Sequence, residues 1–356
     1  MTICPSRISV RLAALLLAIC VLSGSASAST QEWRIRTKGT VDSALFSAHR
    51  LVWAEAVGTN GFRILIARLG EQPRLVAQIP NRRVGLRNDG HDWAYLSLAA
   101  WPGGIAYGYA GKPYYSQMRI VVVPFGRPAR VLWAKSCRKG HTLPQVAITH
   151  RRLLTNRGSC SRPPNNVEES DLLGTHPREL PLWASQMQAS GGFASFVQPA
   201  MGDNALSITA IVDLRTRETV LTIPGDITGP ATLASDGALI FSAQPEFETP
   251  WQVVRASPAE PSPHPIVDDL PDSPAVILTS HGRIAIARSG RFVERPTRID
   301  VFTRSGRRLG GLPKAVHGEF GADVLSFDGR RVAWVIRGPE DPGPETIVVR
   351  CVLDCE

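Results

Sequence analysis

One pattern recurs seven times along this chain of 356 residues. Each copy has a turn pair, a strand of alternating apolar residues, and a hairpin of two further strands. The turn pairs are His49-Arg50, Gly103-Gly104, His150-Arg151, Gly191-Gly192, Asp236-Gly237, His281-Gly282 and Asp328-Gly329, and their first members lie 41 (150 to 191) to 54 (49 to 103) residues apart. This period is typical of β-propellers, in which stacked four-stranded blades bury one another's faces. We therefore predict an all-β fold, a seven-bladed β-propeller of four-stranded antiparallel blades. Six or eight blades remain alternatives, because the unit from Gln145 to Trp183 is irregular.

The last repeat unit is one strand short of a four-stranded blade, and one spare strand segment precedes the first unit. The last unit holds only three strand segments, ADVLSF, RVAWVIR and ETIVVRCVL. A spare alternating segment, EWRIRT at Glu32 to Thr37, precedes the first unit. We predict that this N-terminal strand completes the last blade, because ring closure removes two unpaired sheet edges.

Residues 1–28 have the features of a secretory signal peptide. These features are Arg7 and Arg11, the apolar run Leu12–Leu22 and the small-residue site Ala26-Ser27-Ala28. We predict cleavage after Ala28, a single propeller domain at residues 29–356, and no transmembrane segment after cleavage. The protein is then secreted, either extracellular or periplasmic. A membrane anchor and a lipid on Cys20 are the weaker alternatives.

Four cysteines remain after the predicted cleavage site. An even number in an exported chain predicts two disulfides, and three connectivities are open. Proximity in the sequence favours Cys137–Cys160 and Cys351–Cys355. The second pair needs a turn, because an extended strand holds such Cα atoms about 13 Å apart, beyond the ~7 Å limit of a disulfide. No CxxC pair or matching His spacing occurs, so we predict no metal site and no cofactor.

Basic residues are concentrated in the first part of the chain. Residues 29–160 contain 20 Lys and Arg against 6 Asp and Glu, whereas residues 161–356 contain 18 against 25. Loops that join blades, or that join second to third strands, share one face of a propeller. Their basic residues are Arg82, Arg83, Arg87, Arg138, Lys139, Arg157, Arg162, Arg288, Arg291 and Arg295. These loops predict a binding surface for an anionic partner, and a merely solvated surface is the alternative.

Signatures of catalysis are missing. The chain has no GxSxG elbow, no HExxH zinc motif and no phosphate-binding loop. The leading hypothesis is a secreted, monomeric, non-catalytic module that binds a protein or an anionic envelope polymer, with no nucleic-acid partner. The alternative is a propeller lyase or hydrolase with histidines and a carboxylate at the channel mouth, namely His91, Asp92, His141 and His317. His49, His150 and His281 recur at one repeat position, so we interpret them as turn residues.

The last unit, FDGRRVAWVIRG followed by ETIVVRCV, resembles the WD40-like repeat of TolB-type bacterial propellers. The segments SDGALIF and HGRIAIA with RIDVFTRSGRRL fit the same pattern. The resemblance covers most of Glu32–Glu356, although His or Gly replaces the turn Asp in most units. It implies a propeller fold and an extracytoplasmic scaffold role, and it assigns no functional residue.

Overall fold

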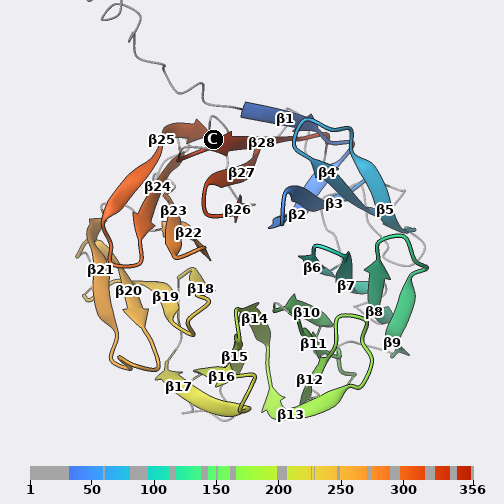
Figure 1. The fold of residues 1–356 in the computed structure, drawn as a ribbon, viewed down its shortest axis with the longest axis horizontal. Helices are drawn as coiled ribbons and strands as arrows, with labels where there is room; N and C mark the ends of the chain where they lie inside the picture. The colour runs from blue at the N-terminus through green and yellow to red at the C-terminus, as the bar shows by residue number, and fades with distance from the viewer. Residues whose placement is uncertain are drawn as a thin grey trace, which may run out of the picture.

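Seven four-stranded antiparallel sheets stand in a ring around a central axis (Figure 1). This computed structural model describes residues 32–58, 61–80, 95–111, 117–137, 143–149, 151–160, 166–198, 207–225, 227, 229–246, 249–270, 274–288, 297–316, 325–336 and 343–353. Within these ranges, no helix is long and apolar enough to cross a membrane.

Each sheet is one blade, and its strands follow one another in the sequence. Blade 1 contains β2 (Thr40–Ser47), β3 (Arg50–Ala56), β4 (Phe62–Arg68) and β5 (Arg74–Ile79). Blade 2 contains β6 (Tyr95–Trp101), β7 (Gly104–Gly111), β8 (Gln117–Pro124) and β9 (Arg130–Ser136). Blade 3 contains β10 (Gln145–Ile148), β11 (Leu153–Asn156), β12 (Asn166–Ser170) and β13 (Arg178–Trp183). Blade 4 contains β14 (Gln186–Ser190), β15 (Phe193–Gln198), β16 (Ile208–Asp213) and β17 (Glu218–Pro224).

The remaining blades complete the ring. Blade 5 contains β18 (Ala231–Leu233), β19 (Leu239–Ala243), β20 (Trp251–Ala256) and β21 (His264–Leu270). Blade 6 contains β22 (Pro274–Ser280), β23 (Arg283–Arg288), β24 (Thr297–Thr303) and β25 (Arg308–Val316). Blade 7 contains β26 (Leu325–Phe327), β27 (Arg331–Ile336), β28 (Thr346–Cys351) and the N-terminal strand β1 (Glu32–Arg36). The predicted seven-bladed fold is therefore confirmed, including the irregular blade 3.

The core lies between the blades. One cluster of buried apolar side chains occupies each of the seven interfaces between neighbouring blades in the described residues. Trp53 and Trp334, from second strands, are almost completely buried in two of these clusters. Burial of apolar faces against the next blade is the main stabilising term, because a single blade has no other partner for them.

The chain closes the ring with its two ends. Strand β1 pairs antiparallel with β28, with Trp33 opposite Val349, as the spare N-terminal strand predicted (Figure 1). The Thr37 hydroxyl donates to the Glu345 carbonyl at 3.0 Å and accepts the Glu345 N–H at 2.9 Å. A carboxylate oxygen of Glu345 accepts the N–H of Val41 at 2.6 Å. The ladder to β1 thus completes blade 7, and buried hydrogen bonds tie blade 7 to blade 1.

A disulfide lies beside the irregular blade 3. Cys137 and Cys160 are joined with their Cα atoms 5.7 Å apart, within the usual disulfide range. Cys351 ends β28, and its predicted partner Cys355 lies outside the described residues.

Strand direction divides the connections between two faces of the ring. Consecutive strands of a blade are antiparallel, so the first-to-second and third-to-fourth turns emerge on one face, here named the turn face. Second-to-third loops and loops between blades emerge on the opposite face, here named the loop face. The first-to-second turns lie nearest the central axis, because the first strand of every blade is innermost (Figure 1).

Candidate functional site

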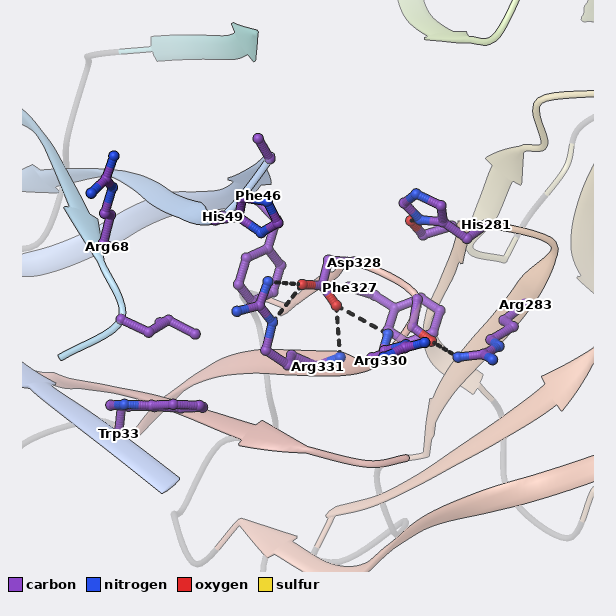
Figure 2. A pocket seen from close by; sticks show the side chains of 14 residues that line it. Trp33, Phe46, His49, Arg68, His281, Arg283, Phe327, Asp328, Arg330 and Arg331 are labelled. Atoms are coloured by element: carbon purple, nitrogen blue, oxygen red, sulfur yellow. Dashed lines mark hydrogen bonds and ion pairs between the residues drawn. The ribbon is translucent and has the colours of Figure 1, made fainter. Parts of the chain in front are cut away.

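A groove of about 870 Å³ opens on the turn face where blades 6, 7 and 1 meet (Figure 2). Turn residues from the three blades line it, and Trp33 on β1 closes its outer side. Aromatic rings, cationic side chains and two imidazoles therefore share one cavity. Its polar residues are His49, Arg68, Ser280, His281, Arg283, Asp328, Arg330 and Arg331.

Asp328 organises the centre of the groove. One carboxylate oxygen accepts the backbone N–H groups of Arg330 and Arg331 at 3.0 and 2.7 Å, and the other accepts Nε of Arg331 at 2.6 Å. The Arg331 guanidinium also lies over the Phe46 ring, 5.4 Å from its centroid. This carboxylate is already fully engaged in shaping its own turn (Figure 2).

Ser280 and His281 form the polar pair beside this turn. Ser280 Oγ lies 2.9 Å from Nδ1 of His281. His281 adopts a left-handed backbone conformation with φ of 49°, which is uncommon for a residue with a side chain. The imidazole is exposed to solvent. The strained turn thus presents the imidazole to the groove while keeping the hydroxyl in hydrogen-bond contact.

Blade 7 holds this pair in place. A Cβ added to Gly329 would lie 3.1 Å from Cβ of His281 and 3.2 Å from its Nδ1, so only glycine fits here without displacing the imidazole. Gly329 also needs its φ of 96°. Arg283 donates to the Gly329 carbonyl at 2.8 Å. The turns of blades 6 and 7 are therefore interlocked.

His49 occupies the same repeat position in blade 1. It is exposed at the β2–β3 turn, and Ala48 before it has a φ of 53°. Ala48 replaces the hydroxyl-bearing Ser280 of blade 6. The repeat position therefore supplies an imidazole in both blades, but only blade 6 supplies the neighbouring hydroxyl.

Two of the predicted basic residues lie within the described part of the chain, and they are far apart in the ring. Arg157, after β11, pairs with Glu168 at 2.8 Å. Arg288, at the end of β23, pairs with the buried Asp300 at 2.5 Å, beside Arg298 and Arg308. Both lie on the loop face, opposite the groove.

The other predicted site residues lie outside the described residues. They are Arg82, Arg83, Arg87, Arg138, Lys139, Arg162, Arg291 and Arg295 of the basic loops, and His91, Asp92, His141 and His317 of the alternative enzyme site. The sequence reasoning missed the groove residues. The one available signal was the recurring histidine of the turn pairs, which we interpreted as a turn residue only.

No protein-family model matches this chain, and no curated protein is similar to it in sequence. Solved structures do resemble it in fold. A puromycin hydrolase matches with a TM-score of 0.55 and 14% identity over 89% of this chain and 53% of its own. The Pyrococcus horikoshii acylaminoacyl peptidase matches with a TM-score of 0.54 and 12% identity over 89% of this chain and 53% of its own.

The β-propeller domain of the Trilobed protease from Pyrococcus furiosus matches with a TM-score of 0.57 and 11% identity over 90% of this chain and 97% of that one. That domain has an open velcro topology, whereas here β1 closes blade 7. This chain spans about half the length of the hydrolase and of the acylaminoacyl peptidase. At such low identity the likeness shows the fold alone.

These comparisons contradict the predicted non-catalytic binding or scaffold module. Similar solved structures include several hydrolases and peptidases, so the comparisons favour the alternative hypothesis of a hydrolase-related propeller. The prediction was wrong because it took missing signatures as evidence against catalysis. A motif search detects only known arrangements of residues, so its negative result is no argument against catalysis.

Proposed function

We propose that this chain hydrolyses peptides or related amides in the groove of blades 6, 7 and 1, with Ser280 and His281 as the reacting pair. The observation that carries the proposal is the 2.9 Å contact between Ser280 Oγ and His281 Nδ1 on the wall of a cavity of about 870 Å³. The similarity in fold to an acylaminoacyl peptidase and to prolyl endopeptidases supports the choice of substrate.

The chemistry follows from this contact. When the neutral imidazole carries its proton on Nε2, the Ser280 hydroxyl donates to Nδ1. Ser280 Oγ then attacks the amide carbon, and His281 takes the hydroxyl proton as general base. His281 returns this proton to the departing amine, and water releases the acyl group from Ser280 by the same steps. Among the described residues, no carboxylate is hydrogen-bonded to His281.

Unbalanced positive charge in the groove supports the same reaction. Asp328 is occupied by Arg331 and by two backbone N–H groups. Arg330 is exposed and lines the cavity. Attack on an amide places negative charge on the carbonyl oxygen, and a cation in a partly enclosed site stabilises that charge.

The first test is peptide cleavage by the full-length mature chain. The purified protein, incubated with a mixed peptide library and followed by mass spectrometry, should release fragments from defined bonds. Ser280→Ala and His281→Gln should each lower kcat/KM at least about 100-fold, because both proton transfer and attack are lost. Ser305→Ala is the matched control, since Ser305 is exposed in a blade 6 turn outside the groove. Absence of cleavage, or full activity in Ser280→Ala, would exclude the proposed reaction.

A second test asks whether the position of His281 matters. Gly329→Ala should lower kcat/KM about tenfold or more, because its methyl group pushes on the imidazole. Gly126→Ala is the matched control: it has a similar φ of 76° but no atom within 4 Å of the added Cβ. Equal effects of the two variants would show that backbone strain alone is responsible.

We also propose that the protein is exported, cleaved after Ala28, and oxidised at Cys137 and Cys160. The signal-like N-terminus and the geometry of the disulfide support this proposal. N-terminal sequencing of the protein recovered from the periplasm or medium should begin at Ser29. A reduced cytoplasmic protein that retains residues 1–28 would contradict it. The monomeric state stays a prediction, and sedimentation would measure it.

A further inference from the structure

A second cavity, of about 280 Å³, lies on the other side of the Ser280–His281 turn, between blades 5 and 6. Ser280, His281 and Arg283 line both this cavity and the groove. The reacting pair therefore stands on a ridge between two hollows on the turn face. A linear substrate lying across the ridge would place one side chain in each hollow, with the bond between them over Ser280.

The two hollows differ in size and lining. Small side chains form much of the smaller one, namely Ser190, Ala234, Ser235, Thr279 and Gly282. Three aromatic rings, those of Trp33, Phe46 and Phe327, form the apolar wall of the groove. The groove volume is about 870 Å³ against about 280 Å³. The smaller hollow thus suits a small side chain, and the groove suits a large aromatic one.

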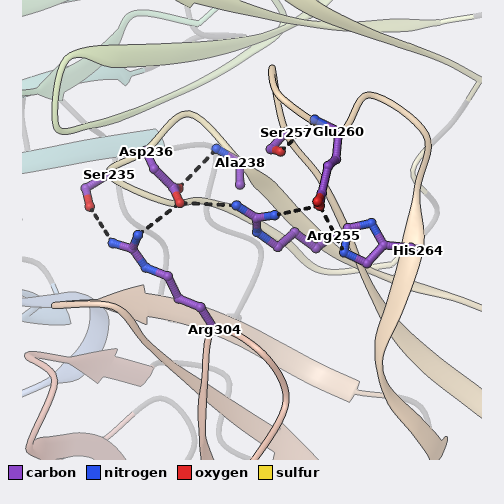
Figure 3. A network of polar contacts seen from close by, with 8 residues as sticks. All are labelled: Ser235, Asp236, Ala238, Arg255, Ser257, Glu260, His264 and Arg304. Atoms are coloured by element: carbon purple, nitrogen blue, oxygen red, sulfur yellow. Dashed lines mark hydrogen bonds and ion pairs between the residues drawn. The ribbon is translucent and has the colours of Figure 1, made fainter.

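The two arginines that line the smaller hollow already have acceptors for their N–H groups. Arg304 donates to Asp236 at 3.0 Å and to Ser235 Oγ at 3.3 Å (Figure 3). Asp236 also accepts from Arg255 at 3.2 Å, and Arg255 lies 3.5 Å from Glu260. Of the charged groups in this network only Arg304 lines the hollow, and its guanidinium is held by Asp236 behind the wall. The other cation that lines it, Arg283, donates to the Gly329 carbonyl at 2.8 Å. An uncharged side chain is the best fit, because a charged one would be desolvated without a partner.

We infer that the two cavities are paired subsites, which select peptides with a small uncharged residue on the blade 5–6 side of Ser280 and a large aromatic residue on the blade 7–1 side. This inference rests on the proposed function, since it takes the Ser280–His281 pair as the point of reaction. It assigns the substrate class from the size, lining and charge of the two cavities.

The test measures binding rather than turnover. Full-length Ser280→Ala protein is titrated by calorimetry with tetrapeptides whose two central residues are varied independently among Gly, Ala, Leu and Trp. Peptides with Ala in one central position and Trp in the other should bind best, and exchanging the two should weaken binding at least about tenfold, an effect of about 1.4 kcal/mol.

Two further variants fill one cavity each. Ser190→Leu, added to Ser280→Ala, should weaken binding of the Ala peptides at least about tenfold while the Gly peptides change less than about twofold, because leucine occupies the smaller hollow. Leu69→Trp, on the groove side, should instead weaken binding of the Trp peptides. Ser305→Leu is the matched control outside both cavities, and melting temperatures confirm that each variant folds.

The outcomes separate the two proposals. Absence of peptide binding would overturn the paired subsites. So would a result in which Ser190→Leu and Leu69→Trp change the selectivity for the same central residue of the peptide, or for neither. Predicted selectivity in binding together with no cleavage by the unmodified protein would support the subsites and overturn the proposed reaction. Cleavage without the size preference would support the proposed reaction and overturn the paired subsites.

Discussion

Two interfaces between blades, each with a buried glutamate, are held together in different ways. The interface of blades 7 and 1, the closing interface, joins residues more than 300 positions apart, such as Val41 and Glu345. The interface of blades 3 and 4, the internal interface, joins residues much closer in the sequence, such as Asn156, whose amide donates to the Ala184 carbonyl at 2.6 Å. The closing interface uses the carboxylate to fix backbone, whereas the internal interface uses Glu169 to hold arginine side chains.

The difference shows that the ring depends on contacts between residues distant in the sequence at the closing interface. Bringing distant ends together costs more chain entropy than joining neighbours, so the closing interface needs directional hydrogen bonds in addition to apolar packing. The groove uses residues of the same interface, because Trp33 comes from β1 and Asp328 from blade 7. Stability of the closure and integrity of the candidate site should therefore change together.

Deletion of Gln31–Lys38 should produce the largest effect. It removes β1, leaves β28 without its outer partner and takes Trp33 from the groove. We expect the melting temperature to fall by at least about 10 °C, measured by circular dichroism against the chain that begins at Ser29. An unchanged melting temperature would show that the closing strand contributes little to the fold.

Glu345→Ala should produce the next largest effect. The variant leaves the buried Val41 N–H without the carboxylate that accepts it at 2.6 Å. We expect the free energy of unfolding to fall by about 2–3 kcal/mol, measured by urea denaturation. Glu345→Gln is the control, since its amide oxygen can still accept this hydrogen bond. Its free energy of unfolding should fall less than that of Glu345→Ala. Equal losses would indicate that the charge, rather than the hydrogen bond, holds the closure.

Glu169→Ala should destabilise the internal interface less. Its two partners, Arg152 and Arg217, lie 3.4 Å away, and their side chains are 53% and 40% exposed. Both can turn to solvent when the carboxylate is removed, so we expect a loss of about 1 kcal/mol, by the same urea experiment. Salt should reduce the difference between the unmodified protein and the variant. A loss of unfolding free energy as large as that of Glu345→Ala would show that the two glutamates contribute equally, so the two interfaces would not differ in this respect.

Most of the fold could be predicted from the sequence because its signals are local and repeated. Alternation within strands and turn pairs at regular intervals define each blade, and the spare segment at Glu32 predicted the closure. The near-complete burial of Trp53 between blades follows from the same alternation, since every second residue of a second strand faces a neighbour.

The candidate site could not be predicted in this way. Ser280 and His281 are ordinary turn residues in their own repeat, and Gly329, which positions His281, lies 48 residues later in the chain (281 to 329). Only the ring brings these turns together on one face. Charge composition drew attention to the opposite face, where Arg157 and Arg288 are paired with carboxylates.

The smallest expected effect concerns Asp171, in a turn of blade 3 away from the closing interface. Burial raises the pKa of this carboxyl, but hydrogen bonds from the Thr175 hydroxyl and from the backbone N–H groups of Thr175 and Leu173, together with His176, lower it below its ordinary value of 3.8. Since the folded pKa lies below that of the unfolded chain, ionised Asp171 stabilises the fold above pH 3.8, and this contribution is lost as the pH falls through the folded pKa.

Asp171→Asn should therefore lower the stability at pH 7 by less than about 1 kcal/mol, because the side chain is 45% exposed and solvent screens its charge. Urea denaturation of both proteins at pH 7 and below pH 3 should show the difference at the higher pH alone. Thr175→Ala should move the carboxyl pKa of Asp171 upward in an NMR titration, because it removes one donor. A stability difference that is equal at both pH values would mean that the amide changes the geometry of the turn rather than its charge.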